Sequence, residues 1–199
     1  MLLPVQLAAA TMRDVGVTWA IAGGWAIDLW VGEQTRAHHD VEVVVPRGDQ
    51  QWVHAALAPG WEMRCLDPPG DGWRPWDGHP LSPPAFQLQA RSSTFELDVF
   101  TETVVDVDDV AMWYFRRDPR VDRPWTEVVI AAADGTPIVR PEVQLLYMAK
   151  SDEPKNQHDF DLARPRLDRA AVAWLAAALA LTIPGHPWLR QLERADPVS

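Results

Sequence analysis

The sequence predicts an α+β fold, with a mixed sheet and flanking helices followed by a small C-terminal helical bundle. Two observations predict it. Short β-branched runs alternate with helical patterns up to residue 140, and after Pro141 the pattern is helical throughout. A chain of 199 residues has room for one domain of ordinary size or two small lobes. We therefore expect two parts, residues 1–140 and residues 141–199.

The first sixty residues carry clear signals for regular elements. We expect helices over 3–15, 25–32 and 48–58, and strands over 17–23 and 40–45. Gly32 suits the end of the second helix, and Asp49 suits the N-cap of the third. In the strand over 40–45 acid and valine alternate, so Asp40 and Glu42 are expected to point to one face.

The middle of the chain is predicted to be a loop followed by strands. Residues 68–84 hold six prolines and three glycines, which indicates an irregular loop, either a lid over a ligand or a plain surface loop. Strands are expected over 85–90 and 94–100, and a hairpin over 126–140 that turns at Asp134-Gly135. The second strand places Glu96, Asp98 and Phe100 on one face.

An acidic run and the helical end complete the layout. The run Val-Val-Asp-Val-Asp-Asp (104–109) is interpreted as the solvated start of a helix, or as a surface that attracts a cationic ligand. Pro141 suits a first helical position. The helices expected in the C-terminal part cover 141–151, 155–164, 168–181 and about 187–194.

Composition restricts the class of protein. A net charge of −10 disfavours nonspecific nucleic-acid binding, because that binding needs Lys and Arg against phosphates. Cys65 is the sole cysteine, so no internal disulfide can form. The N-terminus argues against a signal peptide, and no apolar run reaches the roughly 18 residues of a membrane span. We expect a cytoplasmic protein, monomeric or homodimeric, with neither nucleic acid nor membrane as partner.

One short stretch, Gly-Gly-Trp-Ala-Ile-Asp followed by Arg-Ala-His-His-Asp-Val-Glu, carries the chemistry. A strand that runs into Gly23-Gly24 and then a helix offers backbone amides to a phosphate. Arg36 adds a cation that can grip phosphate. Carboxylates on neighbouring strands suit Mg²⁺, and two such ions about 3.5–4 Å apart can clamp a phosphoryl group. Each feature alone is also typical of ordinary turns and sheet edges, but their order together indicates a site.

The same residues resemble the nucleotidyltransferases of the DNA polymerase β superfamily, and most nearly the aminoglycoside 2''-type and lincosamide branch. The resemblance rests on Gly-Gly-Trp-x-x-Asp and on Arg-x-His-x-Asp followed by an apolar residue and a carboxylate. In this sequence these positions are Gly23, Gly24, Trp25, Asp28, Arg36, His38, Asp40 and Glu42. A weaker likeness covers Asp98 and the segment with Lys150, Lys155, Asp159 and Phe160, where Asn156 replaces an expected Asp.

The resemblance implies that residues 1–140 are a nucleotidyltransferase catalytic domain, in a nucleotidyltransferase-like mixed sheet. It implies an antibiotic-resistance type of transferase that moves a nucleoside monophosphate, AMP from ATP or another nucleotide, to a hydroxyl of a small molecule. The implied metal ligands, which also form the catalytic set, are Asp40, Glu42 and Asp98. The implied nucleotide contacts are Gly23, Gly24, Arg36, His38, Lys150 and Lys155. Asp98, or else Glu96, is expected to accept the hydroxyl proton.

Several alternatives stay open from the sequence. The acceptor is an aminoglycoside-type cation or another small hydroxyl compound. Lys155 contacts phosphate or forms a helical pair with Asp159. The whole chain is an enzyme, an antitoxin-like regulatory protein that acts on or binds a protein partner, an inactive relative that binds nucleotide, or a plain structural domain.

Overall fold

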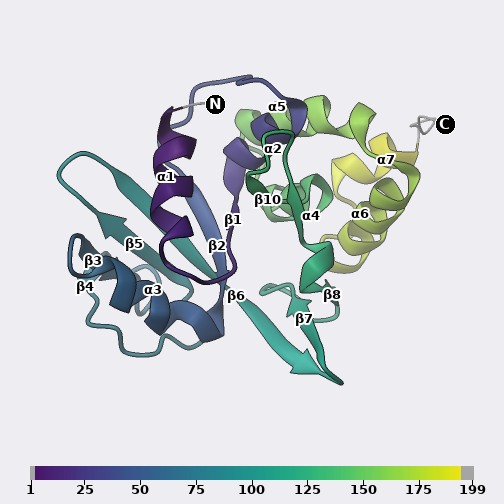
Figure 1. Cartoon of the computed structure of the whole chain (residues 1–199). Coiled ribbons are helices and arrows are strands. Elements are labelled where there is room, and N and C mark those ends of the chain that lie inside the picture. Colours follow the sequence, from purple (N-terminus) through teal and green to yellow (C-terminus); the bar gives the residue numbers. More distant parts are fainter. Residues whose placement is uncertain (1–2, 194–199) are drawn as a thin grey trace.

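A mixed sheet forms the centre of the computed structural model, which describes residues 3–193 (Figure 1). The strands are β1 (Ala20–Ile21), β2 (Glu42–Pro46), β3 (Glu62–Cys65), β4 (Arg74–Pro75), β5 (Gln87–Arg91), β6 (Glu96–Val107), β7 (Val110–Tyr114), β8 (Asp122–Pro124), β9 (Val129–Ala131) and β10 (Pro137–Val139). Their order is β4-β3-β5-β6-β2-β1-β10-β9, with β7 beside β6 and β8 beside β7. The pairs β2–β6 and β1–β10 are parallel. The predicted fold class is confirmed.

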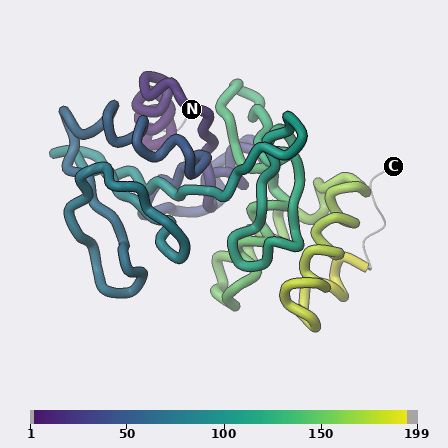
Figure 2. Tube along the Cα trace, turned by 90° about the horizontal axis from the view of Figure 1, so that it is seen from below, coloured from purple at the N-terminus to yellow at the C-terminus, as the bar shows by residue number. Residues whose placement is uncertain are grey.

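Helices lie on both faces of this sheet and build the C-terminal end. They are α1 (Leu3–Arg13), α2 (Gly23–Val31), α3 (Gln50–Leu57), α4 (Pro141–Met148), α5 (Pro154–Ala163), α6 (Arg169–Thr182) and α7 (Pro187–Glu193), with single 3-10 turns at Arg47–Asp49, Trp125–Glu127 and Arg164–Arg166. In Figure 2 the C-terminal helices lie at one end of the molecule, and the segment around α3 and β3 lies at the other. The predicted helices are confirmed with boundary shifts of a few residues; position 194 lies outside the described residues.

Strand β2 separates two hydrophobic cores. Val43 and Val45 pack with α1, α3 and strands β3 and β5 on one face. Val44 points to the opposite face and packs in one cluster with α2, α4, α5 and Trp113 of β7. This alternation is the period-two pattern read from the sequence. Glu42 shares the face of Val44, so the site residues of β2 face the helical half.

The acidic run at 104–109 is not the start of a helix, which corrects the sequence interpretation. Strand β6 continues through Val107 and turns back into β7 as a projecting hairpin, seen at the lower edge of Figure 1. Asp108 and Asp109 form the turn with φ angles of 50° and 64°. Aspartate tolerates this left-handed region, and two such residues make the turn that fits twisted strands.

Other departures concern the ends of elements. Strand β1 is shorter than predicted, α2 begins two residues earlier, and β2 begins at Glu42, so Asp40 precedes the strand. Strands β3, β4, β7 and β8 were not predicted. Asp49 occupies the N-cap position of α3 but its side chain accepts no capping hydrogen bond. Gly32 ends α2 in a left-handed conformation, as predicted.

The proline-rich segment 68–84 is anchored to the body of the protein. It contains β4, which pairs with β3, and Trp76 is a buried member of the core under α3. The Gln50 side chain exchanges two hydrogen bonds with the backbone of Leu81. Only Pro83 and Pro84, at its end, line the main cavity. The indole of Trp76 is therefore part of the core and does not cover a ligand.

The two predicted parts share one of the two hydrophobic cores, the one that contains Val44. Ala20, Ile27 and Val44 of the first part lie in the same cluster as Leu145 and Phe160 of the second. Among residues 3–193, no helix combines the length and the apolar character needed to cross a membrane.

Candidate active site

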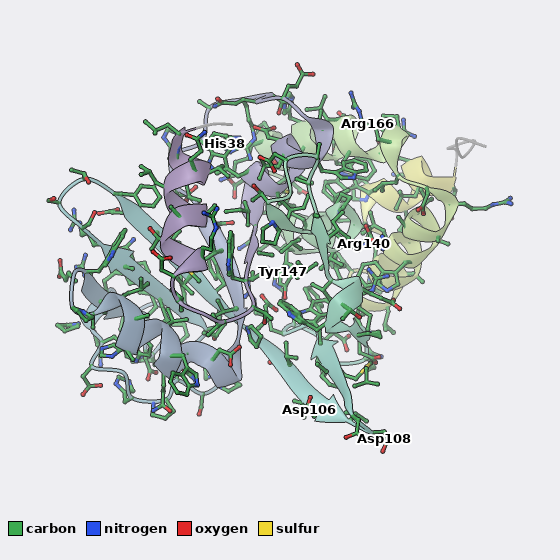
Figure 3. All side chains as sticks on the ribbon, viewed as in Figure 1. His38, Asp106, Asp108, Arg140, Tyr147 and Arg166 are labelled. Carbon is green, nitrogen blue, oxygen red and sulfur yellow. The ribbon has the colours of Figure 1, made fainter. Side chains whose placement is uncertain are left out.

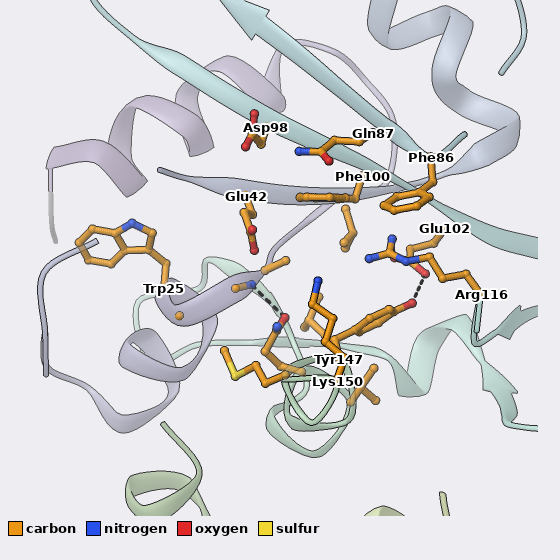
Figure 4. A pocket seen from close by; sticks show the side chains of 18 of the residues that line it. Trp25, Glu42, Phe86, Gln87, Asp98, Phe100, Glu102, Arg116, Tyr147 and Lys150 are labelled. Carbon is orange, nitrogen blue, oxygen red and sulfur yellow. Dashed lines mark hydrogen bonds and ion pairs between the residues drawn. The ribbon is translucent and has the colours of Figure 1, made fainter. Parts of the chain in front are cut away.

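A cavity of about 700 Å³ lies between the sheet and the C-terminal part (Figure 4). Its walls come from the turn into α2, from β2 and β6, and from α4 with the segment that follows it. Glu42 and Asp98 lie side by side on its sheet wall, because β2 and β6 pair in parallel with these two residues opposite each other. All nine site residues predicted from the sequence line this cavity: Gly23, Gly24, Arg36, His38, Asp40, Glu42, Asp98, Lys150 and Lys155.

The three predicted metal ligands differ in their surroundings. Asp40 is exposed just before β2, and the Trp25 Nε1 group donates a 3.0 Å hydrogen bond to its carbonyl oxygen. Burial, with repulsion from Asp40 and Asp98, raises the pKa of Glu42 to about 7. Burial, partly offset by a 3.0 Å hydrogen bond from Gln89 Nε2, raises the pKa of Asp98 to about 6. In the folded protein, Glu42 and Asp98 therefore lose their protons less readily than ordinary carboxylic acids do.

A divalent cation fits the chemistry of these donors. Within the described part of the chain, Asp40, Glu42 and Asp98 have no ion-pair partner within 4 Å. Carboxylate oxygens are the preferred ligands of Mg²⁺. As they stand, however, residues 3–193 bring no three His, Cys, Asp or Glu side chains close enough to hold an ion. The ligand assignment therefore stays a prediction that requires these side chains to converge.

The Gly-Gly turn is built around other site residues. Gly23 has a φ of 65°, which favours glycine, and its N–H donates a 2.9 Å hydrogen bond to Oε1 of Gln144 in α4. A Cβ on Gly24 would clash with Nη2 of Arg36. The first turn of a helix leaves backbone amides without intrahelical partners. That of Gly23 is already used, so the other amides of this turn are the candidates for phosphate.

Arg36 and His38 are held by carboxylates outside the predicted metal set. Arg36 makes a two-pronged ion pair with the buried Asp159 of α5, with Nε–Oδ1 at 2.9 Å and Nη2–Oδ2 at 2.8 Å. The Nε2 atom of His38 lies 2.6 Å from Oδ2 of Asp28, and its ring packs on Trp25. Although burial opposes it, hydrogen bonds from His38 and Thr35 keep the pKa of Asp28 below its usual range.

The two lysines occupy different environments. Lys150 lines the cavity, and no carboxylate of residues 3–193 lies within ion-pair distance of it. Burial and the nearby Arg117 and Arg116 lower the pKa of Lys150. Lys155 pairs with Glu153 at 3.0 Å, so the helical pair with Asp159 is not formed. Asn156 donates to backbone oxygens of Met148 and Ser151, which fixes the join between α4 and α5.

The structure adds a group that the sequence reasoning missed. Glu102 is 2% exposed and accepts hydrogen bonds from Trp113 Nε1, Tyr147 Oη and Arg116 Nη1 at 2.9, 2.5 and 3.2 Å. Figure 3 shows Tyr147 between the two parts of the chain, whereas Asp106 and Asp108 lie at the tip of the hairpin. Glu102 follows Asp98 and Phe100 on one strand face. The same alternation would have indicated it, had the strand been extended beyond residue 100.

Comparison with known proteins supports the predicted resemblance. A family model described as aminoglycoside-2''-adenylyltransferase matches residues 5–61, from within α1 to just before β3. This range contains the Gly-Gly turn, Arg36, His38, Asp40 and Glu42, but not Asp98. A search of curated proteins gives no significant match.

Three solved structures share the fold. The lincomycin-bound lincosamide antibiotic adenylyltransferase LnuA has a TM-score of 0.57 at 16% identity, over 81% of this chain and 95% of its own. The antibiotic-resistance factor ANT(2'')-Ia in solution has a TM-score of 0.56 at 21% identity, over 90% and 89%. ANT(2'')-Ia with adenylyl-2''-tobramycin has a TM-score of 0.55 at 18% identity, over 90% and 95%. The resemblance to nucleotidyltransferase enzymes that act on antibiotics is confirmed, and the fold is theirs.

Proposed function

We propose that this protein transfers a nucleoside monophosphate from a nucleoside triphosphate to a hydroxyl group of a small molecule and releases pyrophosphate. The observation that carries the proposal is the parallel pairing of Glu42 with Asp98 in the wall of a cavity that also contains the Gly-Gly turn. ATP is the expected nucleotide. Aminoglycosides and lincosamides are the first acceptors to test, because the matched proteins act on them.

The residues have separate roles in this reaction. Mg²⁺ held by Asp40, Glu42 and Asp98 would neutralise negative charge on the triphosphate. Amides of the α2 turn after Gly23, with Lys150 and Lys155, bind the phosphates. Arg36 and His38 keep that turn in place through Asp159 and Asp28. The acceptor hydroxyl gives its proton to Asp98 as its oxygen bonds to the α-phosphorus and the bond to pyrophosphate breaks.

Asp98 suits the role of base better than Glu96 does. Asp98 lines the cavity beside Glu42, where an acceptor hydroxyl can reach its carboxylate. Glu96 is outside the lining, is 48% exposed and forms an ion pair with Arg91. We therefore expect Asp98→Asn to abolish turnover while nucleotide binding persists, and Glu96→Gln to keep most of the activity.

The test is pyrophosphate release from each of the four nucleoside triphosphates with Mg²⁺. The acceptor panel contains aminoglycosides, lincosamides and simple sugars, and Asp40→Ala and Asp98→Asn are the negative controls. Release that depends on one acceptor and on both carboxylates supports the proposal. Acceptor-dependent release that survives both substitutions contradicts it.

A second candidate is action on, or binding to, a protein partner. The observation that favours it is an apolar face on the projecting hairpin, where Val105, Val107 and Val110 are 50%, 41% and 44% exposed. Cross-strand pairing places Val107 opposite Val110. Nucleotide binding without turnover of any small acceptor, together with a purified protein that becomes nucleotidylated, would favour this candidate.

A further inference from the structure

One end of the cavity is lined by three arginines gathered around Glu102. We call Arg47, Arg116 and Arg117 the basic wall. They come from the turn after β2 and from the segment after β7. Figure 4 shows the Arg116 guanidinium in the cavity between the rings of Phe86 and Tyr147.

The positive charge of the basic wall exceeds what the protein neutralises. Glu102, the one carboxylate among these arginines, already accepts three hydrogen bonds. Arg47 Nη1 donates to the carbonyl oxygens of Leu81 and Ala85, and Arg117 Nη1 donates to that of Tyr147. In the described structure neither has a carboxylate within 4 Å. Burial and the neighbouring Arg116 lower the pKa of Arg117, as expected for crowded like charges.

Arg116 is held in a fixed orientation. Its Cζ lies 4.1 Å from the centroid of the Phe86 ring and 4.6 Å from that of Tyr147, so aromatic rings cover both faces of the guanidinium. Nη1 lies 3.2 Å from Oε1 of Glu102. A guanidinium has five N–H donors in one plane. The donors that Glu102 does not use are therefore presented at the edge, where a planar or tetrahedral oxyanion can accept two of them.

The basic wall lies in one direction in which an acceptor can extend. If the acceptor hydroxyl meets Asp98, the rest of the molecule can follow β6 within the cavity. Toward the start of the strand, Glu96 is outside the cavity and pairs with Arg91. In the other direction Phe100 and Glu102 share the face of Asp98, at steps of roughly 6.7 Å for two residues of strand. An acceptor that follows this face passes over Phe100 to the basic wall.

A polycation would find no counter-charges along this path. Asp40, Glu42 and Asp98 are assigned to metal and base, and Glu153 pairs with Lys155. The acidic residues at 104–109, which the sequence offered as a surface for a cationic ligand, are not among the cavity residues. Among the described residues, the cavity thus has no carboxylate left over for ammonium groups of an acceptor.

We propose that the acceptor carries a carboxylate or phosphate group that binds the basic wall, and that polycationic aminoglycosides are not the acceptors of this protein. The proposal rests on the proposed function, since it takes Asp98 as the point where the hydroxyl reacts. It adds to that function the sign of the charge that the acceptor carries.

Three sugars of one ring size separate charge from shape. The probes are D-glucuronate, D-glucose and D-glucosamine, which are anionic, neutral and cationic, with tobramycin as the polycation. Saturation-transfer NMR with the full chain measures their binding, with and without Mg²⁺ and an ATP analogue that cannot be cleaved between its α- and β-phosphates. We expect glucuronate to bind more tightly than glucose, and glucosamine and tobramycin to bind least. Arg117→Gln should weaken glucuronate binding by roughly tenfold, the usual effect of losing a charged hydrogen bond.

Arg120→Gln is the matched control. Arg120 follows in the same segment, is 65% exposed, pairs with Asp118 and does not line the cavity. It should leave the binding of all four probes unchanged. Tighter binding of glucosamine or tobramycin than of glucuronate overturns the proposal, as does an equal effect of the two substitutions. An Arg117→Gln variant that loses affinity for the ATP analogue but not for glucuronate also overturns it, because the wall would then serve the nucleotide.

Binding is read without turnover, so the two hypotheses fail separately. Transfer of a nucleotide to tobramycin would contradict the anionic acceptor and leave nucleotidyl transfer standing. The opposite result is a protein that prefers glucuronate through Arg117 and releases no pyrophosphate with any acceptor. That result would contradict nucleotidyl transfer and leave the anionic ligand standing.

Discussion

At the scale of single residues, the site keeps acids together at a cost in stability. The pKa of Glu42 is raised to about 7 from an ordinary value of 4.5, so the folded state holds this proton more tightly than the unfolded state does. Its contribution to the free energy of unfolding is therefore greatest at acidic pH. That contribution falls as the pH rises from about 4.5 to about 7, and the loss is complete above this range.

Glu42→Gln should remove this pH dependence. At pH 8, in EDTA and without nucleotide, we expect the variant to exceed the parent protein in unfolding free energy by on the order of 2–3 kcal/mol. At pH 5 the difference should be small. Urea denaturation at the two pH values measures it, with the exposed Glu62→Gln as control. An equal difference at both pH values would show that burial and repulsion do not raise this pKa.

Gly24 is a second residue whose role can be tested, because a side chain at this position would meet other residues of the site. In Gly24→Ala the new methyl group meets Arg36 and His38, so the ion pair of Arg36 with Asp159 must shift. We expect at least a roughly tenfold loss in nucleotide affinity, because the turn that we propose to bind phosphate moves with it. Gly60→Ala, where a Cβ meets nothing within 4 Å, is the control. Unchanged nucleotide binding in Gly24→Ala would place the phosphates elsewhere.

At this scale the sequence predicted well which residues gather in the cavity, but not what each one contacts. Asp40, Glu42 and Asp98 follow from short-range alternation and one strand pairing. The partners of Arg36 and Gly23 lie more than 120 positions away, at Asp159 and Gln144. No local pattern carries such contacts. Arg36, whose contact with phosphate stays a prediction, forms an ion pair with Asp159 that the sequence did not indicate.

At the scale of elements, the hairpin of β6 and β7 shows how a turn was misread. The run at 104–109 has the acidic character of a helix start, yet the valines alternate as in a strand, and pairing with β7 decides the outcome. A hairpin with Asp at both turn positions uses a conformation that glycine adopts more readily.

Asp109→Gly should accordingly stabilise the hairpin. We expect a gain of roughly 0.5–1 kcal/mol in the unfolding free energy, since the residue adopts a positive φ. The midpoint of urea denaturation should rise with an unchanged slope. Asp106→Gly, within strand β6, is the comparison and should destabilise, because glycine weakens a strand interior. Equal losses in both variants would contradict the turn geometry.

At the scale of the whole molecule, we expect the described residues 3–193 to unfold as one unit across the predicted boundary near Arg140. Val44 in β2 shares a core with Leu145 and Phe160, and the pair of Arg36 with Asp159 joins a loop of the first part to α5. The boundary near Arg140 follows the change from mixed to helical elements in the sequence. The shared core was not predictable, because it depends on how α2 and α4 pack.

Asp159→Asn tests how much the ion pair with Arg36 contributes to holding the two parts together. Asp159 is fully buried and Arg36 is 21% exposed, so removal of the negative charge should cost about 2–3 kcal/mol of unfolding free energy. The parent protein should show one cooperative thermal transition. Asp161→Asn, exposed on the same helix, should change the stability by less than about 0.5 kcal/mol. Two separate transitions in the parent protein would show that the parts fold independently.

The central claim is that the cavity transfers a nucleoside monophosphate, and the fate of the α-phosphate tests it most directly. The measurement uses ATP labelled either at the α- or at the γ-phosphate, with Mg²⁺ and the best acceptor of the panel. The account predicts that the α label appears in the acceptor product and the γ label in pyrophosphate, and that Asp98→Asn forms neither product. A γ label found in the acceptor product would mean phosphoryl transfer, and would contradict the account.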